Sequence, residues 1–121
     1  MKLVNAQLEG VIAALADVSQ NRLPGPIALH VSRSKRAVVE AFGDITEARD
    51  TLIRAHAPDD AEAITPEDDG WDEFSGAFVE MLNDETEVDI KPLDIDSLTA
   101  NGASFKPDSL GLLEYVGLLK D

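Results

Sequence analysis

Hydrophobic residues recur at helical spacing along most of this chain. In residues 6–20 they lie three or four positions apart, which predicts an amphipathic helix, and Asn5 is placed to cap its start. The turn RLPGP, residues 22–26, follows this helix. Two prolines and a glycine cannot continue a helix, so we expect a sharp turn into the next segment.

Residues 27–56 carry the strongest pattern, a heptad seam with spacings of four and three. Its positions are Ile27, Val31, Ser34, Val38, Ala41, Ile45, Ala48, Leu52 and Ala55, and Ser34 is the one polar interruption. The seam predicts a helix of about 45 Å that packs along other helices. The first helix is too short to cover it alone.

Gly43 leaves two interpretations of this segment open. Gly43 followed by the capping-like Asp44-Ile45-Thr46-Glu47 could end one helix and start another. The seam runs straight through that point, however, so we favour one helix. Its packing positions are then Ile27, Val31, Val38, Ile45 and Leu52.

An acidic loop and two further helices are predicted beyond the seam. Residues 57–70, APDDAEAITPEDDG, form the loop, and Thr65-Pro66 is typical of a helix start. We expect a third helix over residues 66–84, with an apolar face of Trp71, Phe74, Phe78, Met81 and Leu82. Asp108 is expected to cap a short, very apolar helix over residues 108–119.

A strand is predicted at about residues 87–95, because Val88, Ile90, Leu93 and Ile95 are separated by polar residues. Pro92 lacks an N–H, so the strand lies at an edge or carries a bulge there. It can pair with the first five residues, MKLVN, or with a strand of another copy. The strand could pair with another chain, and the heptad seam is longer than the helices of the same chain that could cover it. Both features favour a homo-oligomer, with dimer and trimer both open.

These elements predict a mainly α fold with a small β component (α+β) in a single domain, residues 1–121. The domain would contain a helical hairpin with one long heptad-patterned helix, a third helix, a short β-ribbon near the C-terminus and a short apolar C-terminal helix. A chain of this length can form a modest hydrophobic core.

Charge divides the chain into two unequal halves. The net charge is −14, and residues 58–121 contain three Lys or Arg against eighteen Asp or Glu. We therefore expect no direct binding to nucleic acid and no membrane association. The acidity fits a solvated surface, or a face that imitates a phosphate backbone. The sequence has no cysteine, no apolar run long enough to cross a bilayer and no signal-peptide pattern at its start.

No catalytic constellation is visible, so we expect no enzyme activity, no cofactor and no metal. His30 and His56 would lie about 40 Å apart on the long helix, too far to act together in one chain. A calcium loop with Gly70 at its sixth position fails because Gly76 stands where a bidentate Glu is needed. The pair Asp94 and Asp96 is too common a pattern to indicate magnesium.

One basic cluster runs against the acidic trend: Arg33, Lys35 and Arg36 in HVSRSKRAV. Cations within one helical turn can bind a phosphate group or an acidic partner. They can also balance the acidic half of the same fold or of a neighbouring subunit. In an oligomer, two such clusters could converge on one small anionic ligand.

The layout resembles a family of small proteins encoded by tailed bacteriophages and prophages. The similar segments are MKLVNAQLEG, RLPGPI, DITEARDTLIRAHAP, FVEMLNDETEVDIKPLDIDSL and SLGLLEYVGLL, which together extend over nearly the whole chain. The chain departs from the family at HVSRSKRAVVEAFGD, where similar proteins are richer in lysine and lack the glycine. The resemblance implies phage origin and an accessory role, and it implies no reaction.

The leading hypothesis is a binding protein in the host cytoplasm. It would be a homo-oligomer that sequesters or blocks a host defence protein, or a small anionic signal held by Arg33, Lys35 and Arg36. A head or tail morphogenesis factor or assembly chaperone is the alternative. An acidic mimic of nucleic acid is a further one.

Overall fold

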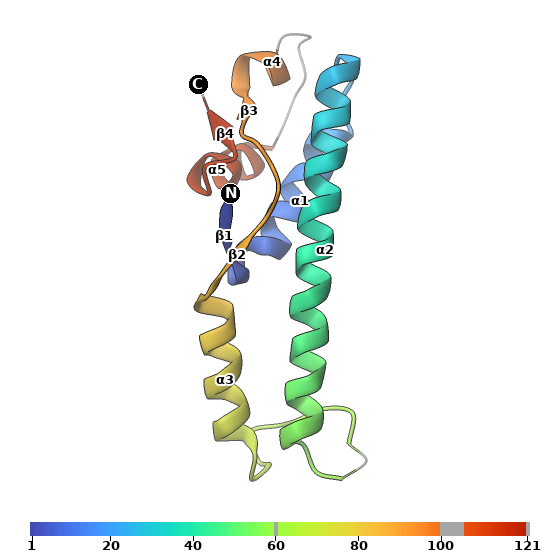
Figure 1. Ribbon diagram of the computed structural model, residues 1–121. Helices are drawn as coiled ribbons and strands as arrows, with labels where there is room; N and C mark the ends of the chain where they lie inside the picture. Colours follow the sequence, from blue (N-terminus) through green and yellow to red (C-terminus); the bar gives the residue numbers. More distant parts are fainter. Residues whose placement is uncertain (60, 100–105, 121) are drawn as a thin grey trace.

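Two helices packed against each other form the centre of the structure. The computed structural model describes residues 1–59, 61–99 and 106–120; Asp60 of the predicted loop lies outside them. After a short 3-10 turn, α1 (Leu8–Ser19) packs along the first half of α2 (Gly25–His56) (Figure 1). The mainly helical fold is confirmed, and so is one continuous helix through Gly43.

The hydrophobic core lies around α1 and the first half of α2. Helix α5 (Pro107–Tyr115) covers α1, and an added Cβ at Gly10 would lie 2.9 Å from Cδ2 of Leu112. The innermost core residues are Leu3, Leu8, Val11, Leu15, Val18, Val31, Val38, Leu93, Leu98, Leu113 and Leu118. None of the described helices is both long and apolar enough to cross a membrane.

The predicted strand pairs inside the chain, but not as one element. Only its first residue, Glu87, belongs to β2 (Glu85–Glu87), which pairs antiparallel with β1 (Lys2–Val4). Val88 extends this pairing by exchanging two backbone hydrogen bonds with Met1, of 2.7 and 2.9 Å. The Ile90 N–H then donates back to the Val88 carbonyl at 2.9 Å, and the Lys91 carbonyl accepts from the His30 side chain. Pairing resumes at β3 (Leu93–Asp94), parallel to β4 (Leu119–Lys120). The single strand over 87–95 was therefore wrong.

Ile95 does not take part in strand pairing. It begins a short helix, α4 (Ile95–Thr99), because the Asp94 carboxylate accepts a hydrogen bond of 3.0 Å from the Asp96 N–H and turns the chain. The other predicted strand positions keep their alternation: Val88, Ile90 and Leu93 are buried. The expected pairing with the first five residues is thus found at Glu87 and Val88, whereas one continuous strand to residue 95 is not.

Helix α3 (Trp71–Asn83) begins later than the predicted residue 66. Thr65 and Asp68 bond to each other's backbone and form an isolated turn, with Thr65 N–H donating to Asp68 Oδ2 at 2.8 Å. Gly70 then passes against the end of α2, where an added Cβ would lie 2.1 Å from the His56 carbonyl oxygen. Because of the turn and this close approach, the helix begins at Trp71.

Helix α5 ends at Tyr115 rather than at residue 119. Gly117 has φ +86°, and the Leu118 N–H donates to the Leu113 carbonyl at 2.8 Å while Gly117 N–H donates to Glu114. This left-handed end turns Leu118 and Leu119 into the core. Asp108 does not cap the helix, since Pro107 is already its first residue and Lys106 stands at the cap without a side-chain bond.

Two glycines should respond oppositely to alanine. Gly43 lies in an exposed helix interior with open space around it, so Gly43→Ala should raise the free energy of unfolding by about 1 kcal/mol. Gly70→Ala should lower it, because the new methyl group meets the backbone of His56. Urea denaturation of both variants measures this, and a stabilising Gly70→Ala would contradict the close approach.

Candidate binding surfaces

The second half of α2 projects beyond the core together with α3 (Figure 1). We call residues 43–84 the arm: the end of α2, the acidic loop and α3. Along α3 (Trp71–Asn83), aromatic side chains contact one another, with ring centroids of Trp71 and Phe74 at 5.8 Å and those of Phe74 and Phe78 at 5.6 Å. Phe74 is the one buried hydrophobic side chain among the described arm residues.

The other large apolar side chains of the arm remain half-buried or exposed. Val79 is 51% exposed. Half-buried are Ile45, Leu52, Ile53, Ile64, Trp71, Phe78, Met81 and Leu82. Two helices alone have no third layer to enclose both sides of their contact. The arm therefore leaves nearly all of its large apolar side chains at least partly open to solvent.

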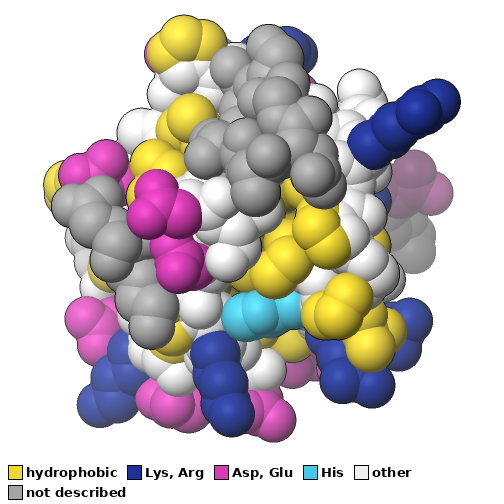
Figure 2. Space-filling model, turned by 90° about the horizontal axis from the view of Figure 1, so that it is seen from above, with side chains coloured by type: hydrophobic (Ala, Val, Ile, Leu, Met, Phe, Trp, Pro, Cys, Tyr) yellow, Lys and Arg dark blue, Asp and Glu magenta, His cyan; other side chains and the backbone are white. Residues whose placement is uncertain are grey.

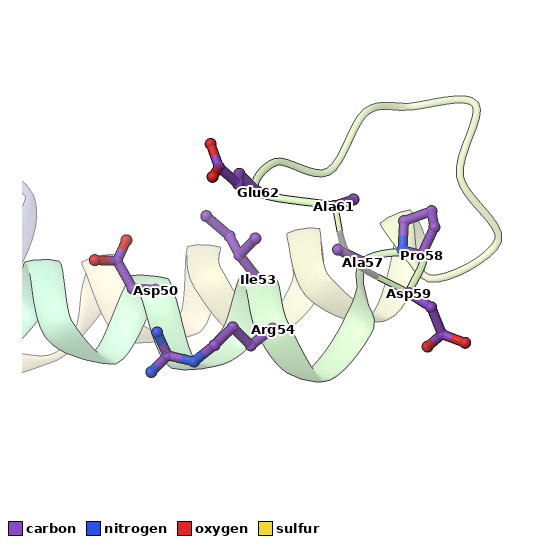
Figure 3. Close-up of a pocket in the computed structure, with 8 residues that line it drawn as sticks. All are labelled: Asp50, Ile53, Arg54, Ala57, Pro58, Asp59, Ala61 and Glu62. Carbon is purple, nitrogen blue, oxygen red and sulfur yellow. The ribbon is translucent and has the colours of Figure 1, made fainter.

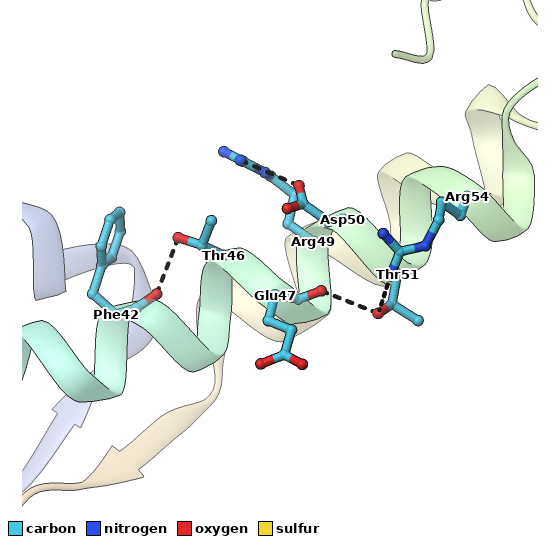
Figure 4. A network of polar contacts seen from close by, with 7 residues as sticks. All are labelled: Phe42, Thr46, Glu47, Arg49, Asp50, Thr51 and Arg54. Atoms are coloured by element: carbon cyan, nitrogen blue, oxygen red, sulfur yellow. Dashed lines mark hydrogen bonds and ion pairs between the residues drawn. The ribbon is translucent and has the colours of Figure 1, made fainter. Parts of the chain in front are cut away.

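Polar side chains on the arm part of α2 bond within their own helix (Figure 4). Thr46 donates to the Phe42 carbonyl and Thr51 to the Glu47 carbonyl, both at 3.1 Å, and Arg54 donates to Thr51 at 3.3 Å. In the described part of the chain, one ion pair joins α2 to α3: His56 and Glu73, 3.6 Å apart. Polar contacts between α2 and α3 are thus few among the described residues.

Nearly all of the excess negative charge belongs to the arm. Residues 43–84 contain thirteen Asp or Glu and two Arg, a net charge of −11. The rest of the chain contains eleven Asp or Glu and eight Lys or Arg, a net charge of −3. The fold thus divides the charge between an acidic arm and a nearly neutral body.

A groove runs along the base of the arm where α1, α2 and α3 meet. It has a volume of about 220 Å³, and Phe42, Ile45, Phe78 and Leu82 form its apolar part. A larger hollow, of about 610 Å³, lies at the tip between the end of α2 and the acidic loop (Figure 3). Asp50, Asp59 and Glu62 line that hollow and outnumber Arg54, and the Asp50 and Asp59 side chains lie at opposite ends of it.

Asn5 ties the base of the arm to the body. The sequence predicted a helix cap at Asn5, but its buried side chain instead donates from Nδ2 to the Met81 carbonyl at 2.8 Å and accepts from the Thr86 hydroxyl. Its backbone N–H donates to the Asp84 carbonyl at 2.9 Å. The end of α3 is thereby fixed to β1.

A second hollow, the basic hollow, lies on the body near the start of α2. It has a volume of about 430 Å³ and is lined by Pro26, Leu29, His30, Arg33, Ser34, Asp89, Ile90 and Lys91. Two segments far apart in the sequence form it, and His30 Nε2 joins them by donating to the Lys91 carbonyl at 3.0 Å. Seen from above, Lys and Arg side chains are spread around the periphery of the molecule, with Asp and Glu side chains among them (Figure 2).

The three predicted basic residues do not converge. Arg33 lines the basic hollow, whereas Lys35 and Arg36 do not. Lys35 lies about 200° around the helix from Arg33 and is half-buried beside the core-facing side. Lys91, rather than Lys35 or Arg36, lines the basic hollow together with Arg33. No local pattern in the sequence could have indicated Lys91.

The predicted packing seam is used mainly inside the chain. Val31 and Val38 are buried, and Ile27 and Ile45 pack against the same core. Leu52 is half-buried on the arm. Only the arm part of the seam is thus left for another molecule, while the strand positions Val88, Ile90 and Leu93 are enclosed by this chain.

Comparisons of the chain with protein-family models, with characterised proteins and with solved structures give no match. Among the described residues, no group of three or more His, Asp or Glu side chains is arranged to hold a metal ion.

Replacing Asn5 by alanine should loosen the arm from the body. The Met81 carbonyl and the Thr86 hydroxyl would lose their partner, so we expect a loss of about 1–3 kcal/mol in the free energy of unfolding. Hydrogen exchange should also quicken at the end of α3. Asn83→Ala is the matched control, because Asn83 is an exposed asparagine at the end of α3 itself. Equal effects of the two substitutions would contradict the role of Asn5.

Proposed function

We propose that this is a non-enzymatic binding protein that docks its acidic arm onto a basic surface of a partner protein and blocks it. One observation carries the proposal: a net charge of −11 lies on a projecting arm whose large apolar side chains, apart from Phe74, are not buried. A surface that combines excess charge with open apolar side chains is typical of an interaction site.

Charge selects the class of partner. Pairing two arms would bring two groups of net charge −11 together, and repulsion between charges closer than a Debye length of about 8 Å is poorly screened by physiological salt. Arm-to-arm self-association is therefore disfavoured. A partner with Lys and Arg around an apolar patch would instead attract the carboxylates of the arm and bury its apolar side chains. A homo-oligomer formed through other surfaces stays a prediction.

The apolar side chains are expected to hold the complex and the carboxylates to steer it. Charge complementarity mainly raises the association rate, while a few central apolar residues slow dissociation. Val79, 51% exposed on α3, is the natural centre for such a contact. Carboxylates flank it on the same helix at Asp72, Glu73 and Glu80.

Proteins that bind nucleic acids present the basic surfaces that such an arm would fit. This supports the interpretation as an acidic mimic and gives the blocking hypothesis a target class. The resemblance to tailed-phage proteins supports the host cytoplasm as the place of action. Head and tail proteins with basic surfaces are the corresponding targets of a morphogenesis factor.

Biolayer interferometry tests the proposal with purified basic DNA-binding proteins of the host as probes. The immobilised protein should bind at least one of them, and both added salt and duplex DNA should weaken the complex. Val79→Asp should weaken it about tenfold or more, although this substitution adds a negative charge.

Tyr115→Asp is the matched control. It adds the same charge and removes a more exposed apolar side chain, 77% exposed, from α5 outside the arm. The affinity of this variant should stay within about twofold of the parent because exposed charges are screened by salt. Equal losses in both variants, or no binding to any basic protein, would overturn the proposal.

A further inference from the structure

The basic hollow has the composition of a ligand site. It is formed by the first turns of α2 and by residues 89–91, which lie between β2 and β3. Its volume of about 430 Å³ lies within the usual range of small-molecule pockets, roughly 300–1,000 Å³. Pro26, Leu29 and Ile90 supply apolar walls, while Arg33 and Lys91 supply positive charge. Neither cation forms an ion pair with any described residue, although the chain holds 24 carboxylates.

Ser34 provides an independent indication that the basic hollow is a ligand site. It is the one polar residue in the heptad seam, it is 2% exposed, and its hydroxyl makes no hydrogen bond to a described residue. No fully enclosed side-chain oxygen or nitrogen of the described residues lacks a partner. The Ser34 hydroxyl must therefore stay open to the hollow that it lines, as a donor without an acceptor.

His30 holds the two sides of the hollow in place. A carbonyl oxygen can only accept, so His30 Nε2 carries the hydrogen in its contact of 3.0 Å with the Lys91 carbonyl. Pro92, which follows, restricts the backbone of Lys91 to extended conformations. Lys91 is thus positioned beside Arg33 by a side chain 61 residues away in the sequence.

We propose that the basic hollow binds a small organic phosphate with an apolar ring, the chemistry of a nucleoside monophosphate. The guanidinium of Arg33, the ammonium of Lys91 and the hydroxyl of Ser34 offer donors for the phosphate oxygens. The apolar walls take the ring, and the Asp89 carboxylate can accept hydrogen bonds from sugar hydroxyls. Two cations and one carboxylate leave a net charge of +1, which suits a single phosphate better than a nucleic-acid strand.

This site is separate from the arm. The basic hollow begins at the first turn of α2, and the arm occupies the other end of the same helix (Figure 1). Loss of one function therefore need not affect the other. In the arm variant Val79→Asp, ligand binding to the basic hollow should match that of the parent protein.

Calorimetry and amide NMR test the proposal with adenosine monophosphate, inorganic phosphate and adenosine as probes. The monophosphate should bind most tightly and shift the amide signals of Ser34 and Lys91. Arg33→Gln and Lys91→Gln should each weaken binding about tenfold or more, since each removes a charge-assisted hydrogen bond. Ser34→Ala should weaken it severalfold while the core keeps its fold.

Arg36→Gln is the matched control, because Arg36 is also a cation on the same helix but does not line the hollow. It should leave the dissociation constant within about twofold of the parent value, since a distant exposed charge is screened. The proposal is overturned if Arg36→Gln weakens binding as much as Arg33→Gln. Equal binding of adenosine or of inorganic phosphate, or no binding of the monophosphate, overturns it as well.

Discussion

A mismatch in length between two packed helices determines the shape of this protein. Helix α2 has 32 residues and extends about 48 Å, whereas α1 has 12 residues and extends about 18 Å. The apolar stripe of α2 continues past the end of α1, so a second segment must return to cover it. Helix α3 does so on one side only. The arm, its half-buried side chains and its separation from the core all follow from this geometry.

Short tertiary contacts hold the remaining elements on that frame. Strands of two or three residues are marginal by themselves, so β1 and β2 depend on the buried Asn5 and on the Met1 ammonium, which lies 3.0 Å from Glu87. At the other end, Gly117 reverses the chain so that Leu118 and Leu119 enter the core and β4 meets β3. Each contact joins residues far apart in the sequence, and together they enclose α1.

One rigid helix thus carries two surfaces of opposite character. Its start contributes to a basic hollow with an open Ser34 hydroxyl, and its end carries an acidic arm with open apolar side chains. The helix keeps them apart, so the negative field of the arm is largely screened where Arg33 and Lys91 lie. A chain with a net charge of −14 can in this way keep a local site for an anion.

The sequence by itself determined the four longer helices, because the periodicity of apolar residues is a local property. The seam from Ile27 to Leu52 predicted α2 through Gly43. It also offered MKLVN as one of two possible pairing partners for the segment that begins at Glu87, and β1 is that partner. Only the tertiary structure decided where α3 begins, how residues 88–92 are bonded and which cation joins Arg33. These depend on contacts such as Gly70 with His56 and His30 with Lys91. Such contacts join distant segments, and local spacing carries no information about them.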